Sequence, residues 1–408
     1  MFLKLKVVLI VLGFEWLLMV FVQVPSFAGQ LDVEKPLKTT IYGWISYKYS
    51  YYKRTGIKSN TSYVLPKNGA SNDKWEQNSR AFTRIGLKIF NPLTKTKANI
   101  TLDSWPKDFN LMLAFVRQGL GDGFYITVGK DWSLIEEHTF SSYCFLPFPA
   151  GFQGSKRFVQ IKLSKKIFYN NVTFKPSISL EYRPEKNGVV IGKNINQKDK
   201  TIIAESGINS SRTNIPAIAL NLSLTFRQNP INLGRVYTFA ELESIYLYFD
   251  GKEHRVNPYT VGCGLDLNFP FSLTVASEYI HTLGMSGVSG IMGNNLKTFS
   301  YLYRSGGLVK RESSAFNIEG KFRLSKKLMF AGGFDFVSFK NKNSSDSLFL
   351  KNEVKNVRTG FVMLEINTTK LTKLFIEFRK IETKYAISLG KFTETDGDQF
   401  WAGYRYYF

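Results

Sequence analysis

The chain ends in DQFWAGYRYYF, residues 398–408, where every second residue from Phe408 back to Phe400 is apolar or aromatic. Successive side chains of a β-strand point to opposite faces, so Phe408, Tyr406 and Tyr404 share one apolar face. The other face is mixed and carries Arg405. A terminal strand with an apolar outer face has to be surrounded by hydrocarbon, which either a protein core or a lipid bilayer supplies.

The N-terminal segment indicates export. Basic residues precede the apolar run VVLIVLGFEWLLMVFVQV, and the small residues of SFA follow it. This order is typical of a secretory signal peptide. An uncleaved anchor helix is the alternative, and Glu15 inside the run counts against both. We therefore predict a signal peptide at residues 1–28 and one mature domain at residues 29–408.

Export narrows the class of protein. No later segment has the ~18 consecutive apolar residues of a spanning helix, so the chain is periplasmic, secreted or an outer-membrane barrel. A closed barrel is the one strand structure that leaves no unpaired backbone edge in lipid. The 35 phenylalanines and 21 tyrosines suit the two aromatic girdles of such a barrel.

The net charge of +22 restricts the partners. A strongly basic chain often binds nucleic acid, but export argues against nucleic acid and leaves anionic lipid headgroups or anionic solutes. The two cysteines, Cys144 and Cys263, are too few for a disulfide framework. Neither has a partner at metal-ligand spacing, so we expect two free thiols, no metal and no cofactor.

Alternation of apolar and polar residues recurs along the mature chain. In SRAFTRIGLKIF, residues 79–90, the apolar side chains oppose Arg80, Arg84 and Lys88. Segments of about ten such residues, separated by turn residues, are typical of transmembrane barrels. Each segment alone is weak evidence, because half-buried strands of soluble sandwiches alternate too. Their number together with the export signal favours a barrel.

Short connections, such as NPLT and QNPIN, alternate along the sequence with longer ones. Short periplasmic turns and longer external loops predict an all-β transmembrane antiparallel barrel of about sixteen strands, with both termini in the periplasm. LKTFSYLYRS and KYAISLGKF are assigned to loops; if both spanned, the count would be about eighteen. The external loops are expected at roughly residues 53–78, 104–109, 131–156, 184–213, 250–257, 282–312, 340–354 and 381–397.

The sequence here resembles Gram-negative outer-membrane porins. The terminal Phe408 with Tyr406 and Tyr404 looks like the assembly signal of that family, which implies the barrel-assembly machinery as a partner. DGFYITVGKDW looks like the strand that enters the third external loop, which in porins folds into the barrel. More narrowly, SRAFTRIGLKI, GFYITVGKDWSLIEEHTF and GFQGSKRFVQIKL look like the trimeric dicarboxylate-type (DcaP-like) porins.

The resemblance covers about residues 78–165 and the terminus, and it implies a homotrimer that passes small carboxylates. The chain departs from that family in one place, since LMLAFVRQ has the single Arg117 where the family often has an arginine-rich strand. Within the predicted third loop, Glu136 and Glu137, followed by His138, would face basic strand residues across a constriction. The alternative is a loop that caps the outer mouth.

The polar face of each strand is expected to line the pore. Rings of Arg and Lys favour anions, so we predict an outer-membrane porin for small hydrophilic, preferably anionic solutes. The alternative is a wall whose charges are compensated, as in a non-selective general-diffusion porin. The predicted basic pore-lining set is Arg80, Arg84, Lys88, Lys97, Lys162, Lys175 and Arg183. The predicted acidic set, mostly toward the external half, is Asp103, Glu181, Glu241, Glu243, Asp266, Glu278, Glu319 and Asp335.

Enzymatic and structural barrels are the remaining alternatives. Barrel hydrolases and acyltransferases need a histidine as general base or orienting group. The chain has His138, His254 and His281, all in predicted loops, so we predict that it is not an enzyme. A structural or adhesive barrel would fill its lumen with large side chains. The basic lumen-facing set argues against this, because unpaired charges in a closed interior are expensive.

Overall fold

A computed structural model describes residues 37–54, 75–105, 108–135, 157–182, 190–193, 202–204, 211–212, 216–228, 231–249, 252–284, 301–304, 307–341, 354–388 and 391–408. The predicted signal peptide, residues 1–28, lies outside these ranges. Among the described residues, no helix is both long and apolar enough to cross a membrane.

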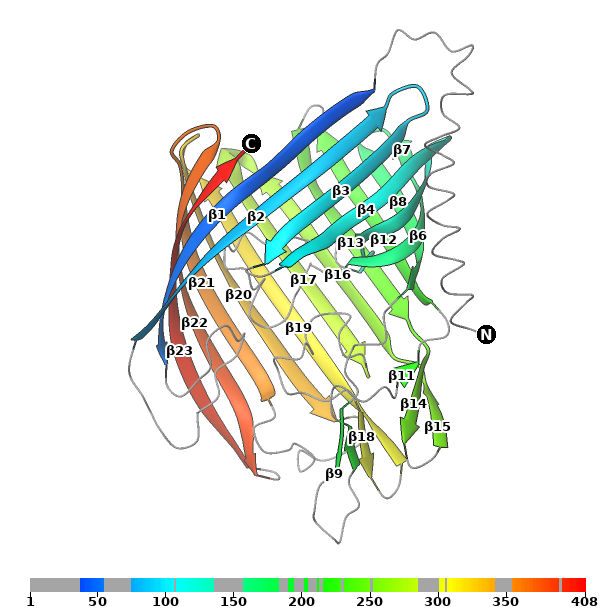
Figure 1. Cartoon of the computed structure of the whole chain (residues 1–408), viewed down its shortest axis with the longest axis vertical. Coiled ribbons are helices and arrows are strands. Elements are labelled where there is room, and N and C mark those ends of the chain that lie inside the picture. Colours follow the sequence, from blue (N-terminus) through cyan, green and yellow to red (C-terminus); the bar gives the residue numbers. More distant parts are fainter. Residues whose placement is uncertain are drawn as a thin grey trace.

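The described strands form a closed antiparallel barrel (Figure 1). β1 (Lys38–Arg54) pairs with β2 (Trp75–Asn91) on one side and with β23 (Lys391–Tyr407) on the other. Sixteen strands of the described ranges make the wall, which confirms the predicted fold class. The other wall strands are β3 (Thr96–Trp105), β4 (Asp108–Gly121), β5 (Phe124–Trp132), β6 (Arg157–Lys165), β8 (Val172–Tyr182), β12 (Ala217–Gln228), β13 (Ile231–Leu242), β16 (Tyr259–Phe269), β17 (Leu273–Leu283), β19 (Gly307–Arg323), β20 (Leu328–Asn341), β21 (Val354–Asn367) and β22 (Thr372–Ser388).

Short strands extend the barrel at the end opposite the C-terminus (Figure 1). β18 (Tyr301–Arg304) pairs with the start of β19 and with β10 (Ile202–Ala204), which also pairs with β9 (Val190–Lys193). LKTFSYLYRS therefore adds no span, as predicted. β11 (Ser211–Arg212), β14 (Ile245–Phe249) and β15 (Lys252–Val256) form a separate sheet, so the predicted loop at 250–257 is largely strand. At the other end, β7 (Ile167–Tyr169) continues β6 along β8.

Two predicted external loops are wrong. β3 extends to Trp105 and β4 begins at Asp108, directly opposite it, so four of the six residues predicted as a loop at 104–109 belong to strands. β22 and β23 pair through the predicted loop 381–397, from Ile381–Gly397 to Ser388–Lys391. Residues 381–397 carry charged side chains on both faces, so they lack the alternation that predicts a strand. A strand beyond the apolar belt needs no apolar outer face. The hairpin lengthens two existing spans and adds none.

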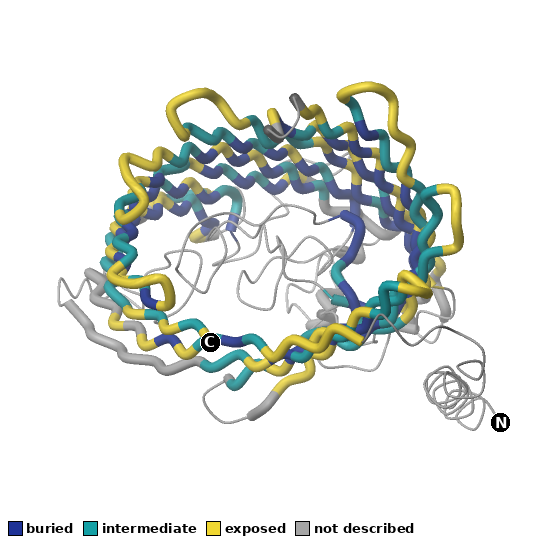
Figure 2. Tube along the Cα trace, turned by 90° about the horizontal axis from the view of Figure 1, so that it is seen from above, coloured by how far each residue is buried: buried dark blue, intermediate teal, exposed yellow. Residues whose placement is uncertain are grey.

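The outer face is apolar along the wall strands. On β1, Ile41 is 69% exposed and Tyr47 is 53% exposed, while Ser46 between their strand positions is fully buried. Figure 2 shows this alternation of exposed and buried residues around the ring. Cys263 lies on the exposed face of β16 as a free cysteine. A continuous apolar exterior is what a barrel in lipid requires.

Cation–aromatic pairs mark both ends of the β5–β6 hairpin. Lys165 Nζ lies 4.3 Å from the ring centroid of Phe124, and the guanidinium carbon of Arg157 lies 3.8 Å from that of Trp132. The nine residues of β5, at ~3.3 Å each and tilted by ~40°, cover about 20 Å of height. That is close to the ~25 Å apolar belt of such barrels, so the two pairs lie at its two edges.

Candidate functional site

The register of the wall strands identifies the inner face. Directly opposed residues of neighbouring strands share a face, and the partners run from Arg84–Asp103 on β2 and β3 to Lys97–Arg117 on β3 and β4. The same face continues through Thr127–Lys162 and onto β8. The predicted residues on this inner face are Arg84, Lys88, Lys97, Lys162 and Lys175.

Two predicted pore-lining residues cannot be placed as side chains. Arg80 lies on β2 opposite Lys48, at the same strand parity as Arg84, and only its backbone position is described. Arg183 lies outside the described residues.

Arg84 is held by a carboxylate. Its Nε lies 2.5 Å from Asp103 Oδ1, and its Nη2 lies 2.7 Å from Oδ2, which makes the pair bidentate. The guanidinium also lies 5.3 Å from the ring centroid of Trp44. Bidentate pairs of this kind fix the geometry of both partners. Since the Asp103 carboxylate neutralises the guanidinium, Arg84 adds little net charge to the lumen.

Asp131 forms ion pairs with two cations. Its Oδ2 lies 2.9 Å from Lys162 Nζ and 3.7 Å from Arg117 Nη2. Lys162 is only 8% exposed, and it also donates to the carbonyl of Trp132 at 3.0 Å. One carboxylate between two cations leaves a net positive charge at this part of the wall.

Lys88 and Lys97 differ from the other predicted residues. Neither has a carboxylate partner among the residues that the structure describes. Lys88 Nζ lies 4.1 Å from the ring centroid of Tyr42, which itself donates to Asn99. Asp131 acts on Lys97 only from beyond ion-pair distance and is paired with Lys162, so the two lysines lack the direct carboxylate partner that Arg84 has.

The opposite half of the wall carries compensated pairs. The sequence predicted the acidic partners of β16 and β19 but missed the basic residues of β22. Those residues could have been predicted, because KLFIEFR, residues 373–379, places Leu374, Ile376 and Phe378 on one parity and Lys373, Glu377 and Arg379 on the other. The ion pairs are Arg235–Asp266 at 2.7 Å and Lys321–Glu319, Lys373–Glu365 and Arg379–Glu377 at 2.8 Å each.

The base of the third external loop lies inside the barrel. The carboxylate of Glu181, which is fully buried, accepts hydrogen bonds from Ser133 Oγ at 2.9 and 3.0 Å and from the Leu134 backbone N–H at 3.2 Å. Ser179 Oγ donates to the same carboxylate at 2.9 Å. The sequence predicted Glu181 as a lumen acid, and the structure shows it fastening the loop.

Amide side chains secure the same segment. Asn221 Nδ2 donates to the Leu134 carbonyl at 3.0 Å, and Gln160 Nε2 donates to the carbonyls of Asp131 and Trp132 at 2.8 Å each. Leu134 and Ile135 are 2% and 1% exposed. The loop therefore starts inward, as predicted, while Glu136, Glu137 and His138 lie outside the described residues, and so does Cys144.

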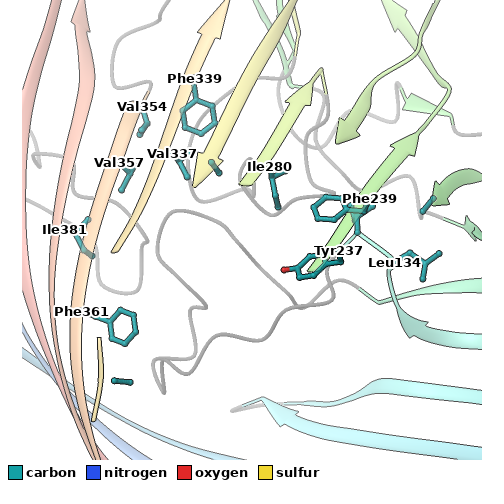
Figure 3. Close-up of a cluster of buried hydrophobic side chains, with 14 of the residues drawn as sticks. Leu134, Tyr237, Phe239, Ile280, Val337, Phe339, Val354, Val357, Phe361 and Ile381 are labelled. Atoms are coloured by element: carbon teal, nitrogen blue, oxygen red, sulfur yellow. The ribbon is translucent and has the colours of Figure 1, made fainter. Parts of the chain in front are cut away.

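An apolar cluster occupies part of the inner face (Figure 3). Phe339 on β20, Phe361 on β21 and Ile381 on β22 are at most 4% exposed and face inward. Leu134 of the loop base joins the same cluster. The expectation of a polar lumen wall is wrong here. In LMFAGGFDFVSF both parities of β20 are largely apolar, so alternation does not tell the inner face from the outer.

The histidines do not assemble a reactive site in the part described. His281 lies on β17 rather than in a loop, with Nδ1 at 3.0 Å from Ser314 Oγ. His254 lies on β15, again in a strand rather than the predicted loop, and His138 lies outside the described residues. Among the described residues, no group of three or more His, Cys, Asp or Glu side chains could hold a metal ion.

A closed sixteen-strand barrel with an apolar exterior, short turns at the end of the termini and an inward loop base has the fold of the outer-membrane porins. No protein-family model and no curated protein matches the chain. The outer membrane channel DcaP of Acinetobacter baumannii matches with a TM-score of 0.64 and 14% identity, over 93% of this chain and 99% of that chain.

Two further solved structures share the fold. A trimer form of OmpT, an outer membrane protein of Vibrio cholerae, has a TM-score of 0.54 and 9% identity over 92% of this chain and 100% of that chain. OprB of Pseudomonas putida has a TM-score of 0.55 and 7% identity over 91% of this chain and 94% of that chain. The fold agrees with the predicted outer-membrane location.

Proposed function

We propose that the chain is an outer-membrane channel for passive diffusion of small hydrophilic solutes, and that it favours anions such as small carboxylates. The observation that carries the proposal is that Lys88 and Lys97 lie on the inner face without an ion pair to any described carboxylate. Rings of Lys and Arg in a pore attract anions and repel cations. The inner face can line a channel, because the strands close into a barrel and Arg84, Lys88 and Lys97 point inward from β2 and β3.

The ion pairs formed by the other basic residues support a preference for anions that depends on Lys88 and Lys97. An ion pair presents a dipole to a passing ion, and its field falls faster than the field of a single charge. A solute within about 8 Å of the wall feels the single charges, since that is the Debye length at physiological salt. Lys88 and Lys97 therefore dominate the selectivity, with Arg117 adding to them across β3 and β4.

We infer that the third external loop, residues 131–156, forms the constriction. Its base is fixed to the inner wall by Glu181, Asn221 and Gln160. Glu136 and Glu137 follow this base directly in the chain, and they would face the basic β2–β4 wall. A carboxylate pair opposite a basic wall gives a transverse field that orders dipolar solutes.

The assembly proposed here is a homotrimer in outer-membrane lipid, inserted by the barrel-assembly machinery through the C-terminal strand. The trimer form of the structurally similar OmpT supports the first part. The exposed aromatics Tyr404, Tyr406 and Phe408 at the outer face support the second. We propose a channel rather than an enzyme, because the solved structures that share this fold include the outer membrane channel DcaP.

Solute uptake into proteoliposomes tests the channel function. The full mature chain is reconstituted, and swelling is followed with small anionic, neutral and cationic solutes of equal size. We expect uptake of all three, fastest for the anion. Vesicles that swell no faster than protein-free ones would contradict a channel. Equal rates for the three solutes would leave the general-diffusion porin as the better description.

A further inference from the structure

We propose that Lys88, Lys97 and Arg117 form a binding site for a compact oxyanion carrying two or more negative charges, of which inorganic phosphate is the first example. The site lies on the inner face of β2, β3 and β4. This inference rests on the proposed channel function and names the class of anion that the inner face of β2–β4 binds.

The strand register forces the cations together. Lys97 and Arg117 are direct cross-strand partners, and Lys88 lies opposite Asn99, two residues along β3 from Lys97. Directly opposed side chains have Cβ atoms about 5 Å apart, and like charges in such positions destabilise a sheet. Local violations of this kind in natural proteins concentrate at functional sites.

The wall supplies little compensation at this point. Asp131 lies 3.7 Å from Arg117 and is held more closely by Lys162, at 2.9 Å. On the opposite half of the described wall, Arg235 and Lys373 each have a carboxylate within 2.8 Å. The charge imbalance is therefore concentrated on β2–β4, where a bound anion would relieve it.

Neighbouring polar groups orient the cations. Arg117 Nε donates to Thr127 Oγ1 at 3.0 Å, which fixes the guanidinium on the inner face. The Tyr42 hydroxyl donates to Asn99 Oδ1 at 3.0 Å, and Lys88 lies over the Tyr42 ring. Hydroxyl and amide groups of Thr127, Tyr42 and Asn99 therefore lie next to these cations on the inner face.

A second group of cations continues the site toward the end of the barrel that carries the termini. Lys166, between β6 and β7, has its pKa lowered from the ordinary 10.5 by burial and then by the positive charges of Lys175, Arg117 and Arg227. Its Nζ also lies 5.4 Å from the ring centroid of Tyr125. Arg117 of the first group is among the positive charges that act on Lys166.

The arrangement favours a compact polyvalent anion over other anions. A monovalent ion compensates one of three cations, whereas hydrogen phosphate offers two charges and several acceptor oxygens within one tetrahedron. Arginine binds phosphate oxygens through its planar fork, and lysine adds a point charge. The charges of an extended dicarboxylate are farther apart than neighbouring cations on adjacent strands, which are ~4.8 Å apart.

Block of the chloride current in planar bilayers tests the site. Sodium phosphate at pH 8, sodium succinate and sodium acetate are added in turn to channels conducting potassium chloride. We expect phosphate to reduce the current at the lowest concentration and acetate not to reduce it. Lys97→Gln and Lys88→Gln should each raise the half-blocking phosphate concentration about tenfold, the loss of one charge-assisted hydrogen bond. Lys326→Gln, at an exposed turn lysine, should change it less than about twofold.

The outcomes separate this inference from the proposed function. Heat-modifiability of each variant first shows that the barrel has assembled. A channel that prefers chloride but is blocked equally by phosphate and acetate overturns the oxyanion site and leaves the proposed function standing. The same holds if succinate blocks more strongly than phosphate, or if Lys97→Gln and Lys88→Gln leave the block unchanged. A channel that prefers potassium overturns both.

Discussion

The ring of the last residue, Phe408, lies directly against Gly43 of the first wall strand. The backbones exchange two hydrogen bonds, Gly43 N–H to Phe408 O at 3.0 Å and Phe408 N–H to Gly43 O at 3.1 Å. A Cβ atom at position 43 would lie 2.5 Å from Phe408 Cζ. The terminal residue thus completes the seam between β1 and β23 at the end of the barrel where β1 begins and β23 ends.

Deletion of Phe408 should lower the amount of protein assembled in the outer membrane and leave the conductance of assembled channels unchanged. The seam loses a backbone pair and the outward aromatic, while the inner wall is untouched. Phe271→Ala is a matched control, since that ring is 89% exposed in a turn. Equal assembly of the truncated and full chains, measured as heat-modifiable protein in outer-membrane fractions, would contradict the role given to the terminal strand.

Gly43→Ala should destabilise the barrel by about 1–3 kcal/mol, the usual cost of overpacking. The new methyl group would lie 2.3 Å from the Arg84 carbonyl oxygen as well as against the Phe408 ring. Denaturant unfolding in detergent micelles measures the change. Gly360→Ala on β21 is the control, because nothing lies within 4 Å of a Cβ built there. If Gly43→Ala and Gly360→Ala had the same free energy of unfolding, the β1–β23 seam would accommodate the added methyl group without cost, which would contradict this prediction.

Glu181→Ala should loosen the third external loop. The substitution removes the acceptor of the Ser133 hydroxyl, the Leu134 N–H and the Ser179 hydroxyl. We expect noisier single-channel currents and faster proteolysis within residues 131–156, at unchanged barrel assembly. Glu382→Ala, at an exposed carboxylate, should change neither readout. A quiet channel with a protected loop in the Glu181 variant would mean that the amide contacts suffice.

The anion preference should fall with rising pH earlier than ordinary lysines titrate. Burial and its cationic neighbours lower the pKa of Lys166, so this side chain loses its charge at a lower pH than an ordinary lysine. Lys166→Arg keeps the charge throughout the range and should remove this early decline. Reversal potentials recorded from pH 7 upward compare the two proteins. Identical pH profiles would assign the decline to other groups.

The terminal strand was predictable because its pattern is local. Alternation in residues 398–408 assigns Tyr404 and Tyr406 to the outer face, and the structure exposes them there. Strand number followed from the same local pattern. The connections at 104–109 and 381–397 were predicted in place but too long, because the β3–β4 and β22–β23 pairs depart from the rule of long external loops.

The electrostatic character of the wall was not predictable in the same way. Parity places Arg84 and Lys88 on one face, and nothing local distinguishes them. The difference comes from the β2–β3 register, which brings Asp103 opposite Arg84 and Asn99 opposite Lys88. Register is a non-local property, so the predicted basic pore-lining set divides into residues with a paired carboxylate, such as Arg84, and residues without one, such as Lys88.

The reversal potential under a potassium chloride gradient tests the central claim most directly. The wild-type channel should have the sign of anion selectivity, and the potential should move toward zero as salt rises, because screening shortens the Debye length. Lys88→Glu with Lys97→Glu should shift it toward cations. Replacement of Lys58 and Lys67 by Glu, in the predicted first external loop, should shift it much less. A wild-type channel that passes potassium over chloride, or equal shifts from the two double variants, would contradict the assignment of selectivity to the β2–β3 wall.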